Sequence, residues 1–336
     1  MADNKAPYKI PSMVDIKEIQ PNGFNAISTF SGCGGSSLGY RMAGFKVLWA
    51  SEFIPAAQDT YNANKATYTI LDNRDIRDVS PQDILEAISL GVGDLDLFDG
   101  SPPCASFSTA GKRESGWGEV KKYSDSNQRT DDLFFEYIRL VKGTQPKVFI
   151  AENVSGLVKG TAKGYFIEII QELKKCGYQV RAKLLDAQWL GVPQARQRII
   201  FIGTRNDLNM RPRFPKPLQY RYTVKDALPN INKCEIGGGF GNVKFLDADK
   251  TVYQTVGTSP SSGNGLATKI ETISGEKRKF TIPELKRICG FPDDFILTGS
   301  EQQQWERLGR AVPPIMMYHI AATVRDNILN KSLIGF

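Results

Sequence analysis

The chain has 336 residues, of which 41% are hydrophobic and 24% are charged, enough for a full α/β domain with a smaller second domain. Its formal net charge of +7 favours a polyanionic partner such as nucleic acid. Five scattered cysteines, one histidine in an apolar run and no long apolar run argue against a metal site, a disulfide framework, histidine-assisted nucleophiles and a membrane span.

Residues 1–23 are polar and punctuated by prolines, and they predict an arm ahead of the fold. They contain no signal-peptide core, so we expect a soluble, cytoplasmic protein. From Phe24 strands and helices alternate, which is typical of a parallel sheet with right-handed crossovers. The first elements that we predict are a strand at 24–30, a helix at 38–43, a strand at 46–51 and a helix at 55–64.

A glycine-rich turn at 31–35 separates the first strand from the first helix. Such a turn lets a ligand approach the backbone, and an acid about 20 residues further on, here Glu52, can bind ribose hydroxyls. The turn lacks the third glycine of Gly-x-Gly-x-x-Gly, so it is not obviously built for the pyrophosphate of NAD. Asp75 follows a third strand at 67–71, where its carboxylate can meet an adenine amino group or cap a helix.

The run from Asp94 to Asp99 predicts a short buried strand that breaks off in the turn 100–104, of sequence Gly-Ser-Pro-Pro-Cys. Two prolines stiffen this turn and hold Cys104 at the carboxyl end of a sheet strand. Active sites of open α/β sheets lie at that edge. Cys104 is therefore a candidate nucleophile, and the five residues alone leave open that it is a small buried hydrophobe.

A polar stretch without periodicity, 105–128, follows Cys104. Loops of this length inside a compact domain are usually functional or disordered, and we expect a mobile lid over the active site. Residues 130–132 predict the cap of a helix that continues through Lys142. A strand at 147–150 then runs into Glu152, which places this carboxylate on the same rim as Cys104.

The next segments predict an amphipathic helix at 165–175 and a hairpin of strands near 180–185 and 198–203. Arg196 and Arg198, two residues apart on an extended segment, share one face. A basic, glycine-rich and helix-poor region then predicts a small domain at 206–280. Helical patterns return from residue 283 and dominate from 305 to 329, and we expect them to close back on the first domain.

Taken together, these segments resemble the cytosine-C5 DNA methyltransferases of bacterial and phage restriction-modification systems. The resemblance runs from Phe24 to about Val324 and rests on six motifs in the family's order. They are Phe30 to Gly35 (the cofactor turn), Pro103-Cys104 (the catalytic motif), Glu152-Asn153-Val154 (the second catalytic motif), residues 194–198 (Gln-x-Arg-x-Arg), residues 278–284 (the end of the variable region) and residues 309–313 (the last motif).

The resemblance implies an α/β fold, with a Rossmann-like S-adenosylmethionine-dependent methyltransferase sheet and a second, smaller target-recognition domain. It implies a DNA (cytosine-5-)-methyltransferase that acts on a flipped-out cytosine in a specific duplex DNA sequence, in restriction-modification or phage DNA protection. We expect a monomer that binds double-stranded DNA and needs no metal ion or membrane. The expected domains are an arm at 1–23, a catalytic domain at 24–205 plus 281–336, and a target-recognition domain at 206–280.

The family's chemistry assigns a role to each motif. A Cys104 thiolate would add to C6 of the ring, Glu152 would place a proton at N3, and Arg198 would hold O2. Arg196 would contact the phosphate or the neighbouring loop. A base inside a duplex exposes neither face of C6, so the nucleotide must be flipped out. The expected S-adenosylmethionine contacts are Phe30, Gly32, Gly34, Gly35, Glu52, Asp75, Ile76, Pro102 and Leu133.

Three residues depart from the family pattern: Pro283 replaces a common arginine, Arg310 replaces a common asparagine, and Pro102 gives a double proline before the cysteine. Three alternatives stay open. The chain could methylate cytosine in tRNA, could be an inactive DNA-binding homologue, or could be an NAD oxidoreductase. The target sequence itself is not readable, because base-specific contacts depend on a few side chains whose geometry only a structure gives.

Overall fold

The computed structural model describes residues 5–103, 121–123, 126–128, 132–158, 162–237, 243–259 and 269–333. Cys104 and most of the segment expected to form a lid lie outside these ranges. None of the helices in the described ranges is long and apolar enough to span a membrane. Within the same part of the chain, no three His, Cys, Asp or Glu side chains are grouped so that they could hold a metal ion.

A seven-stranded sheet forms the larger part of the protein, in the order β3-β2-β1-β4-β7-β10-β8. The neighbours from β3 to β7 pair in parallel, whereas β10 is antiparallel to both β7 and β8. This arrangement confirms the expected Rossmann-like sheet and the hairpin near its far edge. The strands are β1 (Asn25–Thr29), β2 (Lys46–Ser51), β3 (Ile70–Asp72), β4 (Leu97–Gly100), β7 (Val148–Val154), β8 (Tyr178–Asp186) and β10 (Gln197–Arg205).

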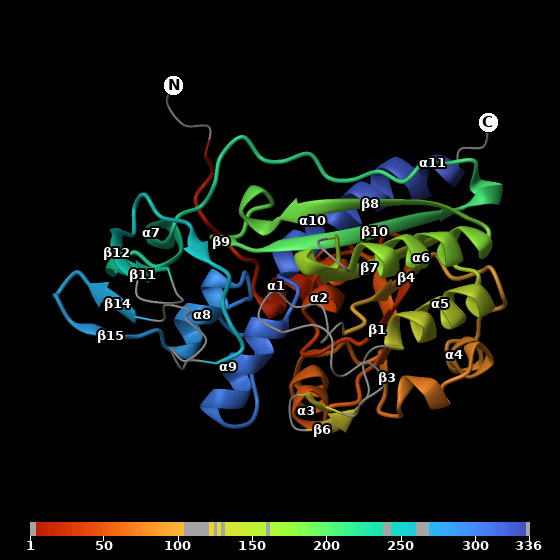
Figure 1. Ribbon diagram of the computed structural model, residues 1–336, viewed down its shortest axis with the longest axis horizontal. Coiled ribbons are helices and arrows are strands. Elements are labelled where there is room, and N and C mark those ends of the chain that lie inside the picture. The colour runs from red at the N-terminus through yellow and green to blue at the C-terminus, as the bar shows by residue number, and fades with distance from the viewer. Residues whose placement is uncertain are drawn as a thin grey trace.

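Successive strand residues point to opposite faces of this sheet, and both faces are buried. Ile27 and Phe149 belong to one core cluster, whereas their neighbours Ala26 and Ile150 belong to another. Helices cover both faces, as Figure 1 shows. The first core contains residues of α4 (Pro81–Ala87), α5 (Leu133–Thr144) and α6 (Ala162–Lys175), and the second contains residues of α2 (Gly35–Met42), α10 (Pro314–Val324) and the π-helical turn at Arg325–Leu329.

A four-stranded antiparallel sheet, in the order β12-β11-β14-β15, forms a second unit at the left of Figure 1. Its core includes residues of the two helices that follow β15 in the chain, α8 and α9. Met210 and Phe214, which begin the expected 206–280 domain, instead pack against the core of the larger sheet. The elements are α7 (Val224–Ala227), β11 (Ile231–Ile236), β12 (Lys244–Asp247), β14 (Lys269–Thr272), β15 (Lys277–Lys279), α8 (Ile282–Ile288) and α9 (Glu301–Arg310).

The first residues that the structure describes do not form an arm ahead of the fold. Met13 and Ile16 of helix α1 (Met13–Glu18) are buried in the core of the second unit. The Tyr8 hydroxyl donates to the carbonyl of Arg287 at 2.7 Å, so the segment is tied to α8. The apolar spacing of Met13 and Ile16 explains this packing, because residues three apart share one face of a helix.

The remaining elements are short connections and edge pairs. A two-stranded antiparallel pair lies within the expected lid, and β9 pairs in parallel with β13. The elements not yet given are α3 (Pro55–Asn64), β5 (Lys121–Tyr123), β6 (Ser126–Gln128), β9 (Gln194–Ala195), β13 (Tyr253–Gln254), α11 (Asn330–Leu333) and the 3₁₀ turns at Ile76–Asp78, Ser155–Val158, Ala187–Trp189 and Asn206–Leu208. The parallel pairing of β9 with β13 joins the second unit to the larger one.

Helix α2 crosses α10 at a distance that requires Gly39. A Cβ atom added at Gly39 would lie 2.6 Å from the Pro314 carbonyl oxygen and 2.9 Å from the Tyr318 backbone nitrogen. We therefore expect Gly39→Ala to lower the free energy of unfolding by about 1–3 kcal/mol through overpacking. Gly164→Ala in α6 is the matched control, because nothing lies within 4 Å there and alanine stabilises a helix. Urea unfolding of both variants measures the contrast, and equal effects would contradict the close crossing.

Candidate active site

The carboxyl ends of β1, β2, β4 and β7 lie along one edge of the sheet, because these strands are parallel. The glycine turn follows β1, Glu52 follows β2 and the double-proline turn follows β4. Gly100 at the end of β4 is opposite Ala151 of β7, and Glu152 is the next residue along β7. The topology thus brings the predicted cofactor turn, the catalytic turn and Glu152 to the same edge.

The glycine turn adopts left-handed backbone at three residues. The φ angles of Phe30, Gly32 and Gly34 are 53°, 55° and 92°, and Gly34 caps the N-terminus of α2. A Cβ atom at Gly32 would meet nothing within 4 Å, so this part of the turn faces open space. Gly35 differs, because its Cβ would lie 2.2 Å from the carbonyl oxygen of Val312 in the last motif. The turn therefore combines an open side with a tightly packed one.

Glu52 is buried, and it joins the end of β2 to the glycine turn. Its carboxylate accepts N–H bonds from Gly32 at 2.7 Å and from Ile54 at 2.8 Å. Burial raises the pKa of Glu52, and the two backbone donors oppose this shift. The predicted ribose-binding acid therefore also fixes the shape of the turn beside it.

Asp75 lies in the turn after β3 and is half-buried. It caps the 3₁₀ turn at 76–78 by accepting from the backbone N–H of Arg77 at 3.0 Å, so the capping role weighed from sequence is present. The Arg77 guanidinium forms ion pairs with Asp75 at 3.0 Å and with Asp132 at 2.7 Å. Asp132 directly precedes α5, whose first residue is the buried Leu133. The expected adenine-binding turn is thus connected to the start of α5.

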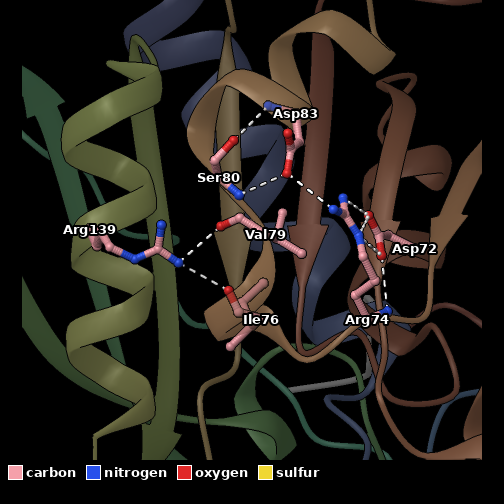
Figure 2. A network of polar contacts seen from close by, with 7 residues as sticks. All are labelled: Asp72, Arg74, Ile76, Val79, Ser80, Asp83 and Arg139. Carbon is pink, nitrogen blue, oxygen red and sulfur yellow. Dashed lines mark hydrogen bonds and ion pairs between the residues drawn. The ribbon is translucent and has the colours of Figure 1, made fainter.

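A second arginine supports the same turn from its other side. Figure 2 shows Arg139 of α5 donating to the carbonyl oxygens of Ile76 and Val79, at 3.0 and 2.9 Å. In the same view Arg74 bonds acidic side chains close to this turn. Sequence reasoning singled out Ile76 and missed Arg139, which lies in the helix before the predicted strand at 147–150. The signal available was an arginine in the middle of a helix most of whose residues are apolar.

The catalytic turn is held from both neighbouring strands. The Ser101 N–H donates to the Thr29 carbonyl of β1 at 3.3 Å, and Asn153 of β7 donates its side-chain amide to the Pro102 carbonyl at 3.1 Å. Gly100 is required at this point, because a Cβ atom there would lie 2.5 Å from the Thr29 hydroxyl oxygen. Pro102 is buried, and Cys104 lies outside the described residues. Contacts with β1 and β7 therefore support the part of the turn that the structure describes, which ends at residue 103.

Glu152 and Arg198 form an ion pair on adjacent antiparallel strands. The Arg198 Nε atom lies 2.7 Å from Glu152 Oε1, and the two side chains are only 13% and 10% exposed. The pairing register explains the contact, since Ile200 of β10 is opposite Glu152 and Arg198 is opposite Val154. A carboxylate and a guanidinium thus stand side by side at the edge that carries the catalytic turn.

Arg196 has a different environment from Arg198. It is 2% exposed, and its guanidinium donates to the carbonyls of Gly309 at 2.9 Å and Arg310 at 3.2 Å. Burial and, to a smaller extent, the charge of Arg198 together lower the pKa of Arg196 to about 9. The expected contact was with a phosphate or the neighbouring loop, whereas the structure describes contacts with the last two residues of α9, and the burial of Arg196 leaves no surface for a phosphate.

Gln194 of the same motif connects the two units. Its side-chain oxygen accepts from the Val256 N–H at 3.1 Å, and its amide donates to the Cys289 sulfur at 3.4 Å. The Thr255 hydroxyl donates to the Ala195 carbonyl at 2.8 Å. The motif at 194–198 therefore attaches the segment returning from the small sheet, whereas Arg198 alone points to Glu152.

Two of the three departures from the family pattern, Arg310 and Pro283, fit their surroundings. Arg310 forms an ion pair with Glu306 at 2.7 Å, one helical turn earlier, and its carbonyl accepts from Arg196. Pro283 lies in the first turn of α8, where Thr281 and Glu284 form a capping box. A proline there removes no helical hydrogen bond. Neither residue disrupts the contacts around the site.

Sequence reasoning missed a buried carboxylate directly beneath the catalytic turn. Asp99 of β4 is 1% exposed, and it accepts hydroxyl bonds from Ser28 and Tyr40, both at 2.8 Å. Burial raises the pKa of Asp99 to about 7. The signal that could have revealed Asp99 is an acidic residue inside β4, a strand in which every residue is buried.

Comparison with known proteins gives consistent matches along the chain. The family described as C-5 cytosine-specific DNA methylase matches residues 24–254 and 238–326. The type II methyltransferase M1.HphI of Haemophilus parahaemolyticus is 32% identical, over 89% of this chain and 86% of that protein. M.NgoPII of Neisseria gonorrhoeae is 29% identical, over 91% of this chain and 97% of that protein.

Solved structures of similar fold cover nearly the whole chain. A prophage-encoded E. coli chain, named as a DNA modification methyltransferase, matches with a TM-score of 0.68 at 21% identity, over 92% of this chain and all (100%) of that one. A DNMT2 variant of Spodoptera frugiperda matches with a TM-score of 0.65 at 19% identity, over 93% of this chain and 100% of that one. At these identities the two structures are similar to this chain in fold.

The two carbonyl contacts of Arg196 predict a structural role for its guanidinium. We expect Arg196→Met to lower the free energy of unfolding by about 2–4 kcal/mol, because two buried carbonyl oxygens lose their donor. The exposed Arg213 provides the control, since Arg213→Met should change stability by less than about 0.5 kcal/mol. Urea unfolding measures both variants. An Arg196→Met variant as stable as the parent protein would contradict the role.

Proposed function

We propose a mechanism and a biological setting for this chain, which belongs to the C-5 cytosine-specific DNA methylase family. As a member of that family it is a DNA cytosine-5 methyltransferase. We infer that it methylates one cytosine in a defined duplex sequence, as the type II names of its relatives suggest for a restriction-modification system. The observation that carries the mechanism is the Glu152–Arg198 pair at the edge of the catalytic turn.

The residues at the sheet edge suit S-adenosylmethionine as the methyl donor. The open side of Gly32 leaves room for a ligand beside the turn, and the carboxylates of Glu52 and Asp75 follow neighbouring strands. We assign Glu52 to the ribose hydroxyls and Asp75, with Ile76, to the adenine, together with the contacts expected from Phe30, Gly34, Gly35, Pro102 and Leu133. When bound, S-adenosylmethionine supplies an electrophilic methyl group on a sulfonium sulfur.

The chain's own part in the reaction is to make cytosine C5 nucleophilic. The Cys104 thiolate forms a bond to C6, the C5–C6 double bond opens, and the ring becomes an enamine with electron density at C5. After methylation the proton on C5 leaves, the double bond re-forms and the thiolate departs. The double proline and its contacts to β1 and β7 hold the segment that leads to this cysteine.

Glu152 and Arg198 would receive the other side of the ring. N3 and O2 are adjacent on cytosine, and the two side chains that would bind them lie 2.7 Å apart. Glu152 would deliver a proton to N3 as the thiolate adds, and Arg198 would hold O2. In the structure the two groups pair with each other, so an entering base would replace their mutual contact with contacts to itself.

We assign DNA recognition to the small sheet and the basic segments around it. Lys277 of β15 lies 5.4 Å from the centre of the exposed Phe245 ring of β12, which gives this sheet a basic and aromatic surface. Within the expected basic run, Arg221 stacks on Trp189 at 4.9 Å, so it contacts the protein. Residues 224–279 are therefore a narrower target-recognition domain than 206–280, and phosphate contacts elsewhere would come from exposed side chains such as Arg213.

Removal of the Glu52 carboxylate tests the cofactor site. We expect Glu52→Ala to weaken S-adenosylmethionine binding by about 1.5–3 kcal/mol, the magnitude for hydrogen bonds to a charged group. The exposed Glu86, which lies on α4 away from the turn, is the control, and Glu86→Ala should bind normally. Titration calorimetry on folded protein measures both. Unchanged affinity in Glu52→Ala would remove this residue from the site.

A mechanism-based trap tests the reaction. Fluorine cannot leave C5 as a cation, so duplex DNA with 5-fluorocytosine at the target should stall as a covalent adduct that depends on S-adenosylmethionine. We expect the adduct to survive denaturing electrophoresis and to be absent in Cys104→Ser, whose hydroxyl pKa is too high to give the anion. Bisulfite sequencing of DNA from cells that express the protein identifies the target site for this experiment.

Two other cysteines serve as controls for the trap. Cys33 and Cys289 are each 2% exposed, and burial raises the pKa values of their thiols to about 12 and about 11. Cys33→Ser and Cys289→Ser should therefore still form the adduct. The mechanism would be contradicted if Cys104→Ser formed the adduct, or if the parent protein formed no adduct at a confirmed target site. Methyl transfer to tRNA but not to DNA would instead support the tRNA alternative.

A further inference from the structure

A buried polar contact connects the cofactor side of the site to the catalytic side. Asp99 lies five residues before Cys104, in the strand that leads into the catalytic turn. Its carboxylate accepts from the Ser28 hydroxyl of β1 and the Tyr40 hydroxyl of α2, each at 2.8 Å. Since β1 enters the glycine turn and α2 leaves it, one carboxylate holds both elements that flank that turn.

The backbone around Asp99 strengthens the same connection. The Thr29 hydroxyl donates to the Asp99 carbonyl at 3.1 Å, and the Ser101 N–H donates back to the Thr29 carbonyl at 3.3 Å. Gly100 lets the two strands approach this closely, as the 2.5 Å separation of a built Cβ from the Thr29 hydroxyl shows. A shift of the glycine turn would therefore move the start of the catalytic turn as well.

Asp99 is costly to bury, and this cost distinguishes it from the buried Asp96, which lies three residues earlier in the chain. Asp96 forms an ion pair with Lys147 at 2.7 Å, whereas no lysine or arginine among the described residues pairs with Asp99. Buried carboxylates without a cation lower stability unless hydrogen bonds compensate. Strongly shifted acids of this kind gather at functional sites.

We propose that Asp99 is a positioning residue for methyl transfer, whose carboxylate accepts both hydroxyls and so holds the catalytic turn in register with the cofactor turn. The proposal rests on the methyltransferase function proposed above, since it names what keeps the two halves of that site aligned. The two hydroxyls donate to different oxygens of Asp99, so asparagine at this position would present an NH2 donor to one of them in place of an acceptor. The Asp99→Asn variant therefore removes the ionised carboxylate while it keeps the shape of the side chain.

The role carries a pH dependence, because the carboxylate accepts both bonds only when ionised. The pKa of Asp99 is raised to about 7, chiefly by burial and also by the charge of Glu152 on β7. The other titratable groups that interact with Asp99 are Tyr40, Tyr61 and Tyr137, and burial raises the pKa of each of them further from neutrality. A pKa that is higher in the folded state gives stability that is present below about pH 4 and lost as the pH rises to about 7.

The test compares Asp99→Asn and Tyr40→Phe with Asp96→Asn as the matched control. We expect the first two variants to lose about tenfold in kcat, with the Kd for S-adenosylmethionine changed less than twofold, since Glu52 and Asp75 are untouched. The wild-type kcat should rise through about pH 7 more steeply than that of Asp99→Asn. Asp99→Asn should melt at an equal or higher Tm, with a larger gain at pH 8 than at pH 5. Asp96→Asn should lower Tm and keep kcat within twofold.

Two results would overturn the proposal. One is a kcat within twofold of wild type in Asp99→Asn and Tyr40→Phe. The other is a parallel loss of kcat and Tm in Asp99→Asn, which is what a purely structural residue would give. If wild-type protein methylates neither DNA nor tRNA, the function proposed above fails, whereas a lost kcat in Asp99→Asn beside an active parent bears only on Asp99.

Discussion

The seven-stranded sheet is buried on both faces, and this constraint confines the chemistry of the protein to the ends of its strands. Residues of β4 and β7 are almost wholly buried, so a polar side chain in mid-strand would need its own partner. At the carboxyl edge the strands stop, and the turns that follow present backbone and side chains to a ligand. The glycine turn, the double-proline turn and Glu152 all stand at this edge because the strands before them are parallel.

The turns at this edge are supported by side chains from other parts of the chain as well as by their own hydrogen bonds. Arg139 on α5 fixes the carbonyls of the adenine-side turn, Glu52 fixes the glycine turn, and Asn153 fixes the catalytic turn through the Pro102 carbonyl. Each support comes from a different secondary-structure element. Asp99 is the one acid of this group that is buried inside a strand, and it joins two of the turns.

Gln194 and Arg196 of the Gln-x-Arg-x-Arg motif make structural contacts, whereas Arg198 lies at the proposed reaction site. Gln194 attaches the segment from the small sheet, and Arg196 supports the end of α9 at 309–310 from a buried position. Only Arg198 reaches Glu152. The motif therefore connects the recognition unit, the last motif and the reacting edge, and substitutions in it should affect stability and activity to different degrees.

The sequence by itself determined the element order, the parallel sheet, the hairpin and the family, because alternating apolar runs, glycine turns and motif order are local properties of the chain. It also placed Glu52, Asp75 and Glu152 at strand ends. Only the tertiary structure decided that Arg196 faces the end of α9 while Arg198 faces Glu152, and that Met13 and Ile16 anchor the N-terminal segment. It alone revealed Asp99, whose partners lie 71 and 59 residues away in the chain. Such contacts depend on which strands become neighbours and on strand register, and no local pattern encodes either.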